Sequence, residues 1–172
     1  DELEGTGATE LACELGAVSC DHLLKVSDAG ISALSESNTI AVLLPATSCF
    51  LGKFPGAPAR RLLDAGVAVA IGTDFNPGTS TAMSMSLVMT LACSTLGMSP
   101  EEAFTAATWN AAWAAGLGGR CGALAPGFPA DALIFSASHY GEVPYRFGVN
   151  LVDTVIKGGR VVYRDSSSLR RN

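Results

Sequence analysis

Charge is the scarcest property of this chain. Only 16% of its 172 residues are charged, 48% are hydrophobic, and the net charge is −5. Its adjacent basic pairs are Arg60-Arg61 and Arg170-Arg171, the latter in a Ser-rich tail, and no larger basic cluster supplies the basic face that nucleic-acid binding requires. It also lacks an apolar run near the roughly 18 residues of a membrane span. We therefore expect a soluble protein that binds neither nucleic acid nor membrane.

Paired cysteines are also missing. The five cysteines are odd in number, widely spread and free of any Cys-x-x-Cys spacing. This pattern argues against a disulfide framework or a zinc knuckle and favours a reducing compartment, which predicts a cytoplasmic protein. Most lie among apolar neighbours and are expected to be small buried residues. They are Cys13, Cys20, Cys49, Cys93 and Cys121.

The beginning of the chain lacks an initiator Met and a signal-peptide pattern, since it opens on Asp1-Glu2. The hydrophobic fraction is high for a free-standing domain of this length, because a small domain has much surface to solvate. Both observations predict a fragment whose amino-terminal part is absent.

The first two thirds of the chain alternate apolar runs with helical patterns. Continuous apolar runs, rather than alternating ones, are typical of parallel strands buried on both faces. Pro45 should stop the second run and begin a loop, and a cap at Thr79, Ser80 or Thr81 should begin the helix after the third run. The predicted strands cover residues 17–22, 39–44 and 67–73, and the predicted helices cover residues 5–15, 27–34 and 58–64, with a loop over residues 46–56.

The last part of the chain has a different pattern. Ser99-Pro100-Glu101-Glu102 is a strong helix start, and Trp109 and Trp113 are expected in the core of the helical stretch that follows. Beyond it, three runs indicate antiparallel strands. We therefore divide the chain into residues 1–120 (an α/β unit), 121–165 (a small β unit) and 166–172 (a polar tail).

Two titratable residues close predicted strands. His22 ends the first run and Asp74 the third, and the carboxyl ends of parallel strands meet on one side of a sheet, where barrel enzymes hold their chemistry. Asp74 could bind a cation and accept a proton from its water, and His22 could shuttle a proton. The structural alternatives are a turn at Asp74 and a structural histidine. By position alone Glu2 and His139 are surface groups.

The segment after Asp74 offers ligand-binding groups. Asn76 and Thr79 supply directional hydrogen bonds, and Gly78 allows close backbone approach. Backbone amides at the start of the next helix could hold a substrate carboxylate.

Three stretches resemble one known family. Residues 108–112 (Thr-Trp-Asn-Ala-Ala) and 122–131 are similar to the helix and return strand that close barrels of the amidohydrolase superfamily. Residues 73–80 (Thr-Asp-Phe-Asn-Pro-Gly-Thr-Ser) are more specific: with them the chain resembles the carboxyl-terminal part of the imidazolonepropionase family. The resemblance implies the last strands of a (β/α)8 TIM-like barrel plus part of a small β-sandwich domain.

The same resemblance implies roles. Asp74 is similar to the family's metal-ligating aspartate, His22 to its active-site histidine, and Glu2 to a glutamate that contacts substrate and moves protons. A second set is similar to substrate-binding positions: Asn76, Gly78 and Thr79. The implied cofactor is one divalent metal, zinc or iron, the implied partner is a small-molecule substrate, and a homodimer is left open for the whole enzyme.

The implied reaction is hydrolytic opening of the ring amide of 4-imidazolone-5-propanoate to N-formimidoyl-L-glutamate in histidine degradation. The family's other metal ligands, a His-x-His pair and a further His, have no counterpart in this chain. We therefore expect the isolated polypeptide to be inactive. Two alternatives remain: another cyclic-amide hydrolase or deaminase of the superfamily, or a truncated homologue that acts as a binding module.

Overall fold

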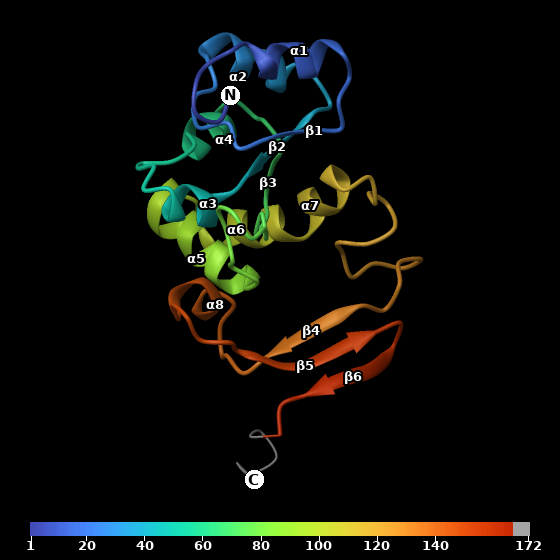
Figure 1. Cartoon of the computed structure of the whole chain (residues 1–172). Coiled ribbons are helices and arrows are strands. Elements are labelled where there is room, and N and C mark those ends of the chain that lie inside the picture. Colours follow the sequence, from blue (N-terminus) through green and yellow to red (C-terminus); the bar gives the residue numbers. More distant parts are fainter. Residues whose placement is uncertain (167–172) are drawn as a thin grey trace.

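Residues 1–166 are described by the computed structural model, which forms an elongated molecule with a sheet toward each end (Figure 1). The first sheet is parallel and has the order β1-β2-β3, with β1 at Ser19–Asp21, β2 at Ile40–Leu43 and β3 at Val69–Ile71. The second is antiparallel and has the order β4-β5-β6, with β4 at Ala132–Phe135, β5 at Val152–Lys157 and β6 at Arg160–Arg164. The predicted α/β class and both strand directions are confirmed.

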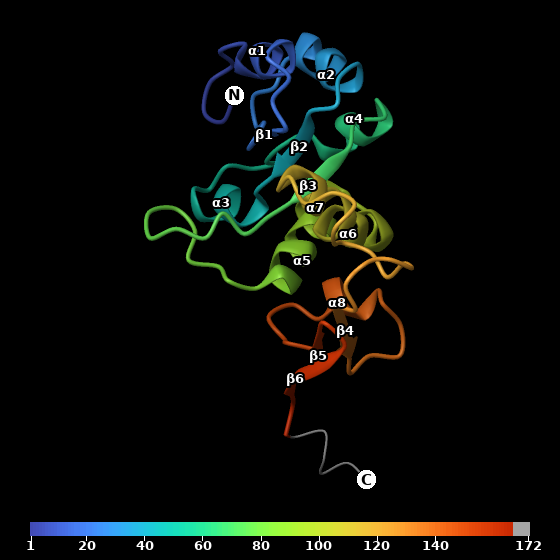
Figure 2. The ribbon, with the colours of Figure 1, turned by 90° about the vertical axis from the view of Figure 1, so that its right-hand side faces the viewer.

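Helices connect and cover the parallel strands. Figure 2 shows α3 and the segment between β3 and α5 on one side of this sheet, with α4 and α6 on the other. The helices are α1 (Ala8–Glu14), α2 (Asp28–Ser35), α3 (Pro45–Phe50), α4 (Ala59–Asp64), α5 (Met85–Leu96), α6 (Pro100–Ala107), α7 (Trp109–Ala114) and α8 (Glu142–Tyr145).

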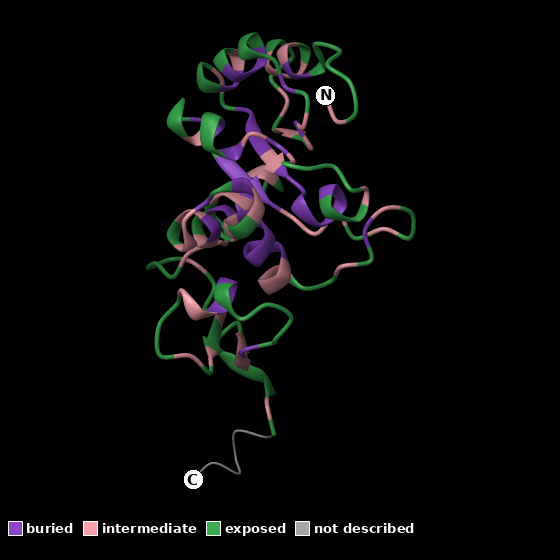
Figure 3. Cartoon of the chain, turned by 90° about the vertical axis from the view of Figure 1, so that its left-hand side faces the viewer, coloured by how far each residue is buried: buried purple, intermediate pink, exposed green. Residues whose placement is uncertain are grey.

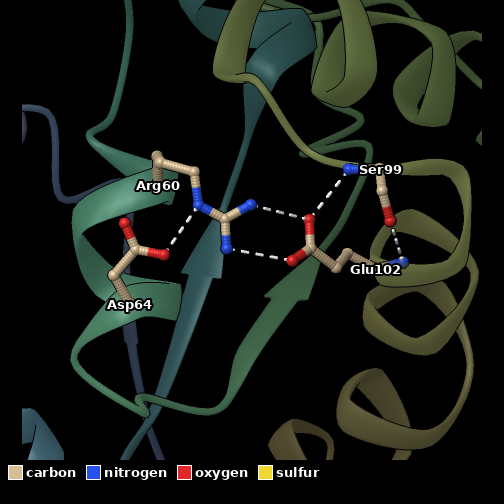
Figure 4. A network of polar contacts seen from close by, with 4 residues as sticks. All are labelled: Arg60, Asp64, Ser99 and Glu102. Atoms are coloured by element: carbon tan, nitrogen blue, oxygen red, sulfur yellow. Dashed lines mark hydrogen bonds and ion pairs between the residues drawn. The ribbon is translucent and has the colours of Figure 1, made fainter.

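The start of α6 joins a helix cap to an ion pair. Ser99 accepts from the Glu102 backbone N–H at 3.2 Å, and Glu102 Oε2 accepts from the Ser99 N–H at 2.8 Å, which is the predicted capping box. The Arg60 guanidinium on α4 donates two hydrogen bonds to the same carboxylate, at 3.0 and 2.9 Å, and a third to Asp64 (Figure 4). Arg60 thereby lowers the pKa of Glu102. One carboxylate therefore caps α6 and ties it to α4.

Two local predictions were wrong, and one short helix was missed. Residues 46–56 are not all loop, because Pro45 begins α3: its fixed φ suits the first turn of a helix. The cap of α5 is Ser84, which accepts from the Leu87 N–H, and not Thr79, Ser80 or Thr81. The short helix α8 was not predicted at all.

The hydrophobic core lies around the parallel sheet, where Figure 3 shows most of the buried chain. Leu23, Leu43 and Val88 are fully buried there. Val143 of α8 and Leu151 belong to the same cluster, and α8 packs on α5. Packing therefore crosses residue 120, and the boundary drawn there stays a prediction based on sequence character.

Two burial predictions were wrong. All five cysteines are free, but Cys49 is exposed and the other four are only partly buried. Trp109 and Trp113 are 39% and 46% exposed, and they line a depression of about 590 Å³ together with the residues that lead into β2. Between them, Asn110 turns inward and its Nδ2 donates to the Val69 carbonyl at 2.7 Å.

Candidate active site

The first candidate residue lies directly after β1. The His22 backbone N–H donates to Val42 O at 2.9 Å, which continues the ladder with β2. His22 and Leu23 then adopt left-handed backbone angles, with φ of 71° and 60°. Residues with side chains rarely adopt this conformation, and it is enriched at functional sites. The fully buried Leu23 side chain anchors the turn, so the imidazole is held at the carboxyl edge of the sheet.

Asp74 occupies a matching position after β3. It also has a left-handed backbone, with φ of 49°. Its Oδ2 accepts a 2.6 Å hydrogen bond from Thr47 Oγ1 in the first turn of α3. The described chain has three non-glycine residues with positive φ, and two of them, His22 and Asp74, are the residues predicted from the sequence to be catalytic.

The loop after Asp74 is organised by Asn76. Its Nδ2 donates to the Asp74 carbonyl at 2.6 Å, and its Oδ1 accepts from the backbone N–H groups of Gly78 and Thr79 at 2.9 and 2.7 Å. Ser80 closes the loop through its Oγ, which bonds Thr73 O at 2.8 Å. This loop contains three of the four predicted substrate-binding residues, Asn76, Gly78 and Thr79, whereas the fourth, Glu2, lies beside His22. The structure also gives Asn76 an internal role, since its side chain already holds this turn.

Glu2 lies beside His22. Its Oε1 is 3.5 Å from His22 Nδ1, and the two side chains are 35% and 24% exposed. That nitrogen is buried and makes no hydrogen bond within residues 1–166. Because 3.5 Å exceeds a normal hydrogen bond, the contact is an electrostatic approach at most. From sequence alone Glu2 was expected to be a solvated surface group; its side chain is instead partly buried beside His22.

Asp1 holds Glu2 in place. Its carboxylate accepts from the N–H and hydroxyl of both Thr6 and Thr9, and its carbonyl accepts from the Lys25 N–H at 2.9 Å. Thr9 is fully buried. The segment is thus fixed to α1 and to the turn after β1.

Two groups of residues therefore flank the end of β2. His22 with Glu2 lies on the β1 side, and Asp74 with its loop on the β3 side. Strand spacing of about 4.8 Å puts β1 and β3 roughly 10 Å apart. Within residues 1–166 no hydrogen bond or ion pair joins the two groups. The remaining candidate, His139, is exposed as expected and lies on the small β unit.

The described residues do not form a metal site by themselves. Nowhere in residues 1–166 do three or more His, Cys, Asp or Glu side chains cluster closely enough to hold a metal ion. Catalytic zinc sites use about three protein ligands. Asp74 can supply one, so the expected zinc or iron does not fit this chain alone.

Sequence reasoning gave no role to Thr47 or Asp1. The strand pattern predicts that residues 45–48, a stretch that contains Thr47, face the same pocket as His22 and Asp74, but it selects no residue within that stretch. The role of Asp1 could not be predicted, because its hydrogen bonds to Thr6 and Thr9 form only when the chain folds back at the start of α1.

The site's polar groups at the ends of parallel strands fit a hydrolase of the β/α type, and comparison with known proteins supports that class. The amidohydrolase family profile matches residues 26–162. The chain therefore belongs to the amidohydrolase family.

Within this family the chain is similar to imidazolonepropionases. It is 52% identical to that of Geobacillus kaustophilus over 165 residues, which are 96% of this chain and 39% of the relative. It is 49% identical to that of Porphyromonas gingivalis, again over 96% of this chain and 39% of the relative. The chain thus spans about two fifths of the length of the curated relatives it matches.

Solved structures support the fold. An adenosine deaminase from Xanthomonas campestris with bound zinc matches with a TM-score of 0.75 at 22% identity, over 88% of this chain and 40% of that one. The guanine deaminase of E. coli matches with a TM-score of 0.69 at 22% identity, over 86% of this chain and 39% of that one. None of the helices in residues 1–166 is both long and apolar enough to cross a membrane.

Proposed function

We propose that this chain forms the carboxyl-terminal part of an imidazolonepropionase, which hydrolyses the ring amide of 4-imidazolone-5-propanoate to N-formimidoyl-L-glutamate. The observation that carries the proposal is the identity of 52% with the imidazolonepropionase of Geobacillus kaustophilus over nearly the whole chain. The placement of His22 and Asp74 at one sheet edge agrees with it.

The proposed chemistry assigns a task to each candidate residue. Asp74 accepts a proton from water as the water oxygen bonds to the ring carbonyl carbon. His22, beside Glu2, stabilises the negative oxygen that develops there. The carbon–nitrogen bond then breaks, and the ring nitrogen takes up the proton that Asp74 accepted from the water. The loop around Asn76, Gly78 and Thr79 binds the propanoate end of the substrate. The Gly78 and Thr79 N–H groups donate to Asn76 Oδ1 in the free chain, and they exchange this acceptor for the carboxylate when the substrate binds.

The proposal also concerns the fold of the complete protein, of which this chain forms a part. The three parallel strands are the last part of a (β/α)8 barrel, and the antiparallel strands are part of a small β-sandwich domain. Asp74 is the one ligand that this chain contributes to a divalent zinc or iron ion, and the other ligands come from outside it. The five free cysteines favour a cytoplasmic setting for this small-molecule enzyme.

The test compares the isolated chain with the complete protein that contains it. Metal content is measured by elemental analysis and ring opening by the ultraviolet absorbance of imidazolone propanoate. We expect one metal and turnover in the complete protein, and neither in the chain of residues 1–172.

The same assay separates the alternatives. Turnover of a purine or another cyclic amide, without ring opening of imidazolone propanoate, would indicate a different hydrolase of the family. Stoichiometric metal in the isolated chain would contradict the assignment of the other ligands to a missing part. A complete protein without metal or turnover would favour a binding module.

A further inference from the structure

The Thr47 hydroxyl has no carbonyl of its own helix to bond. Helical threonines such as Thr90 and Thr95 on α5 donate to the carbonyl four residues earlier, at 3.0 and 2.7 Å. Thr47 lies in the first turn of α3, so the residue four positions earlier is Leu43 of β2, whose carbonyl accepts from the Gly72 N–H. Thr47 donates to the side chain of Asp74, 27 residues away. Its hydroxyl therefore connects two separate strand ends and does not serve its own helix.

The donor is rigidly placed. Thr47 is 1% exposed, and its backbone carbonyl accepts from the Leu51 N–H at 2.9 Å within the turn of α3. The helix packs against α5. A buried β-branched side chain on a packed helix has little rotamer freedom, so the position of the hydroxyl is set before any ligand arrives.

The acceptor needs such support. The left-handed backbone of Asp74 is unfavourable for a residue with a side chain, and such conformations persist only where the surroundings hold them. Asn76 holds the main chain through the Asp74 carbonyl. Thr47 holds the side chain through Oδ2, while Oδ1 has no hydrogen bond within residues 1–166. The two carboxylate oxygens of Asp74 therefore differ in hydrogen bonding: Oδ2 is held by Thr47 and Oδ1 is available to a ligand.

We propose that Thr47 is a positioning residue: it fixes the Asp74 carboxylate through Oδ2 so that Oδ1 is the oxygen that works in the reaction. The inference rests on the proposed function of Asp74. Residues that orient an active-site carboxylate typically change activity 10- to 100-fold when they are replaced. Thr47 touches no reacting atom and acts through Asp74.

The test uses the complete protein with three variants. Thr47→Val keeps the shape and removes the hydroxyl, Thr47→Ser keeps the hydroxyl, and Thr90→Val removes a buried hydroxyl outside the site. We expect Thr47→Val to lower kcat about 10- to 100-fold with KM changed less than about twofold. Thr47→Ser is expected to stay within about threefold of the parent. Thr90→Val is expected to keep kcat, whatever its effect on the melting temperature.

Each outcome decides the inference. Equal losses in Thr47→Val and Thr47→Ser would make Thr47 a packing residue, and an unchanged kcat in Thr47→Val would remove its role. If Thr47→Val does not fold, Thr47→Cys replaces it, since a thiol is a weak donor; a kcat equal to that of Thr47→Ser would then overturn the inference. Inactivity of both the parent and Thr90→Val would instead reject the proposed function.

Discussion

Thr47 Oγ1 lies 2.6 Å from Asp74 Oδ2, so the helix that follows β2 holds the carboxylate that follows β3. The contact joins two segments that are neighbours only because parallel strands place their carboxyl ends side by side. The candidate site is therefore a property of adjacent strand ends and not of one loop.

The first prediction concerns Asp74. In the complete protein, Asp74→Ala is expected to lower kcat by about 10²- to 10⁴-fold, the usual contribution of a proton acceptor. Asp28→Ala is the matched control, because the Asp28 side chain is 93% exposed on α2 and pairs with Arg61, not with a residue of the site. Retained metal and near-normal turnover in Asp74→Ala would exclude this residue from the mechanism.

The sequence was sufficient for the features that depend on local chemistry. The helix predicted over residues 27–34 is confirmed, and Ser27 caps it by accepting from the Gly30 N–H at 2.9 Å. The Ser99 capping box is confirmed, and so are the parallel strands, whose buried apolar runs leave few alternatives. The positions of His22 and Asp74 after two of these strands follow directly from that pattern.

The missed features depend on tertiary contacts. Nothing in the sequence near Thr47 identifies Asp74 as its partner, and the four-residue helix α8 is too short for a periodic pattern. Trp109 and Trp113 were assigned to the core because aromatic residues usually pack there. Their exposure depends on which elements cover α7, which local spacing does not specify.

The second prediction tests the cap of α6. Ser99→Ala removes the acceptor of the Glu102 N–H and is expected to lower the free energy of unfolding by about 1 kcal/mol. The measurement is urea unfolding followed by circular dichroism. Ser35→Ala on α2 is the control, expected within about 0.5 kcal/mol because that side chain is exposed and is not a cap. Equal effects of the two changes would contradict the role of the cap.

The third prediction concerns pH. Hydrogen bonds from Ser138 and then Arg146 lower the pKa of Glu142 from 4.5 to about 2. A carboxyl group whose pKa is lower in the folded state stabilises the fold above its unfolded pKa, and this contribution disappears as the pH falls toward the folded value. Glu142 should therefore lose its stabilising effect between about pH 4.5 and pH 2.

Unfolding midpoints at several pH values between 5 and 2 would test this prediction. Glu142→Gln should have a lower midpoint than the parent at pH 5, and the difference should shrink on acidification. Glu14→Gln, at an exposed position on α1, is the control. A difference between Glu142→Gln and the parent that stays constant over this range would contradict the assignment.

The fourth prediction orders the cysteines by reactivity. Burial raises the pKa of the Cys20 and Cys93 thiols, and the thiolate is the reactive form. Cys49 is exposed. Brief treatment with iodoacetamide at neutral pH should therefore modify Cys49 first, as measured by peptide mass spectrometry. Faster modification of Cys20 or Cys93 would show that the exposure in solution differs from that described.

The bond from Asn110 to Val69 affects how the parallel sheet can grow. Ala68 and Gly72 bond toward β2, so by alternation the backbone groups of Val69 and Ile71 point to the open side of β3. Asn110 has already taken the carbonyl of Val69. A further strand along this side would find the Val69 carbonyl already engaged, so a single amide side chain disfavours the registers that need a ladder bond to that carbonyl.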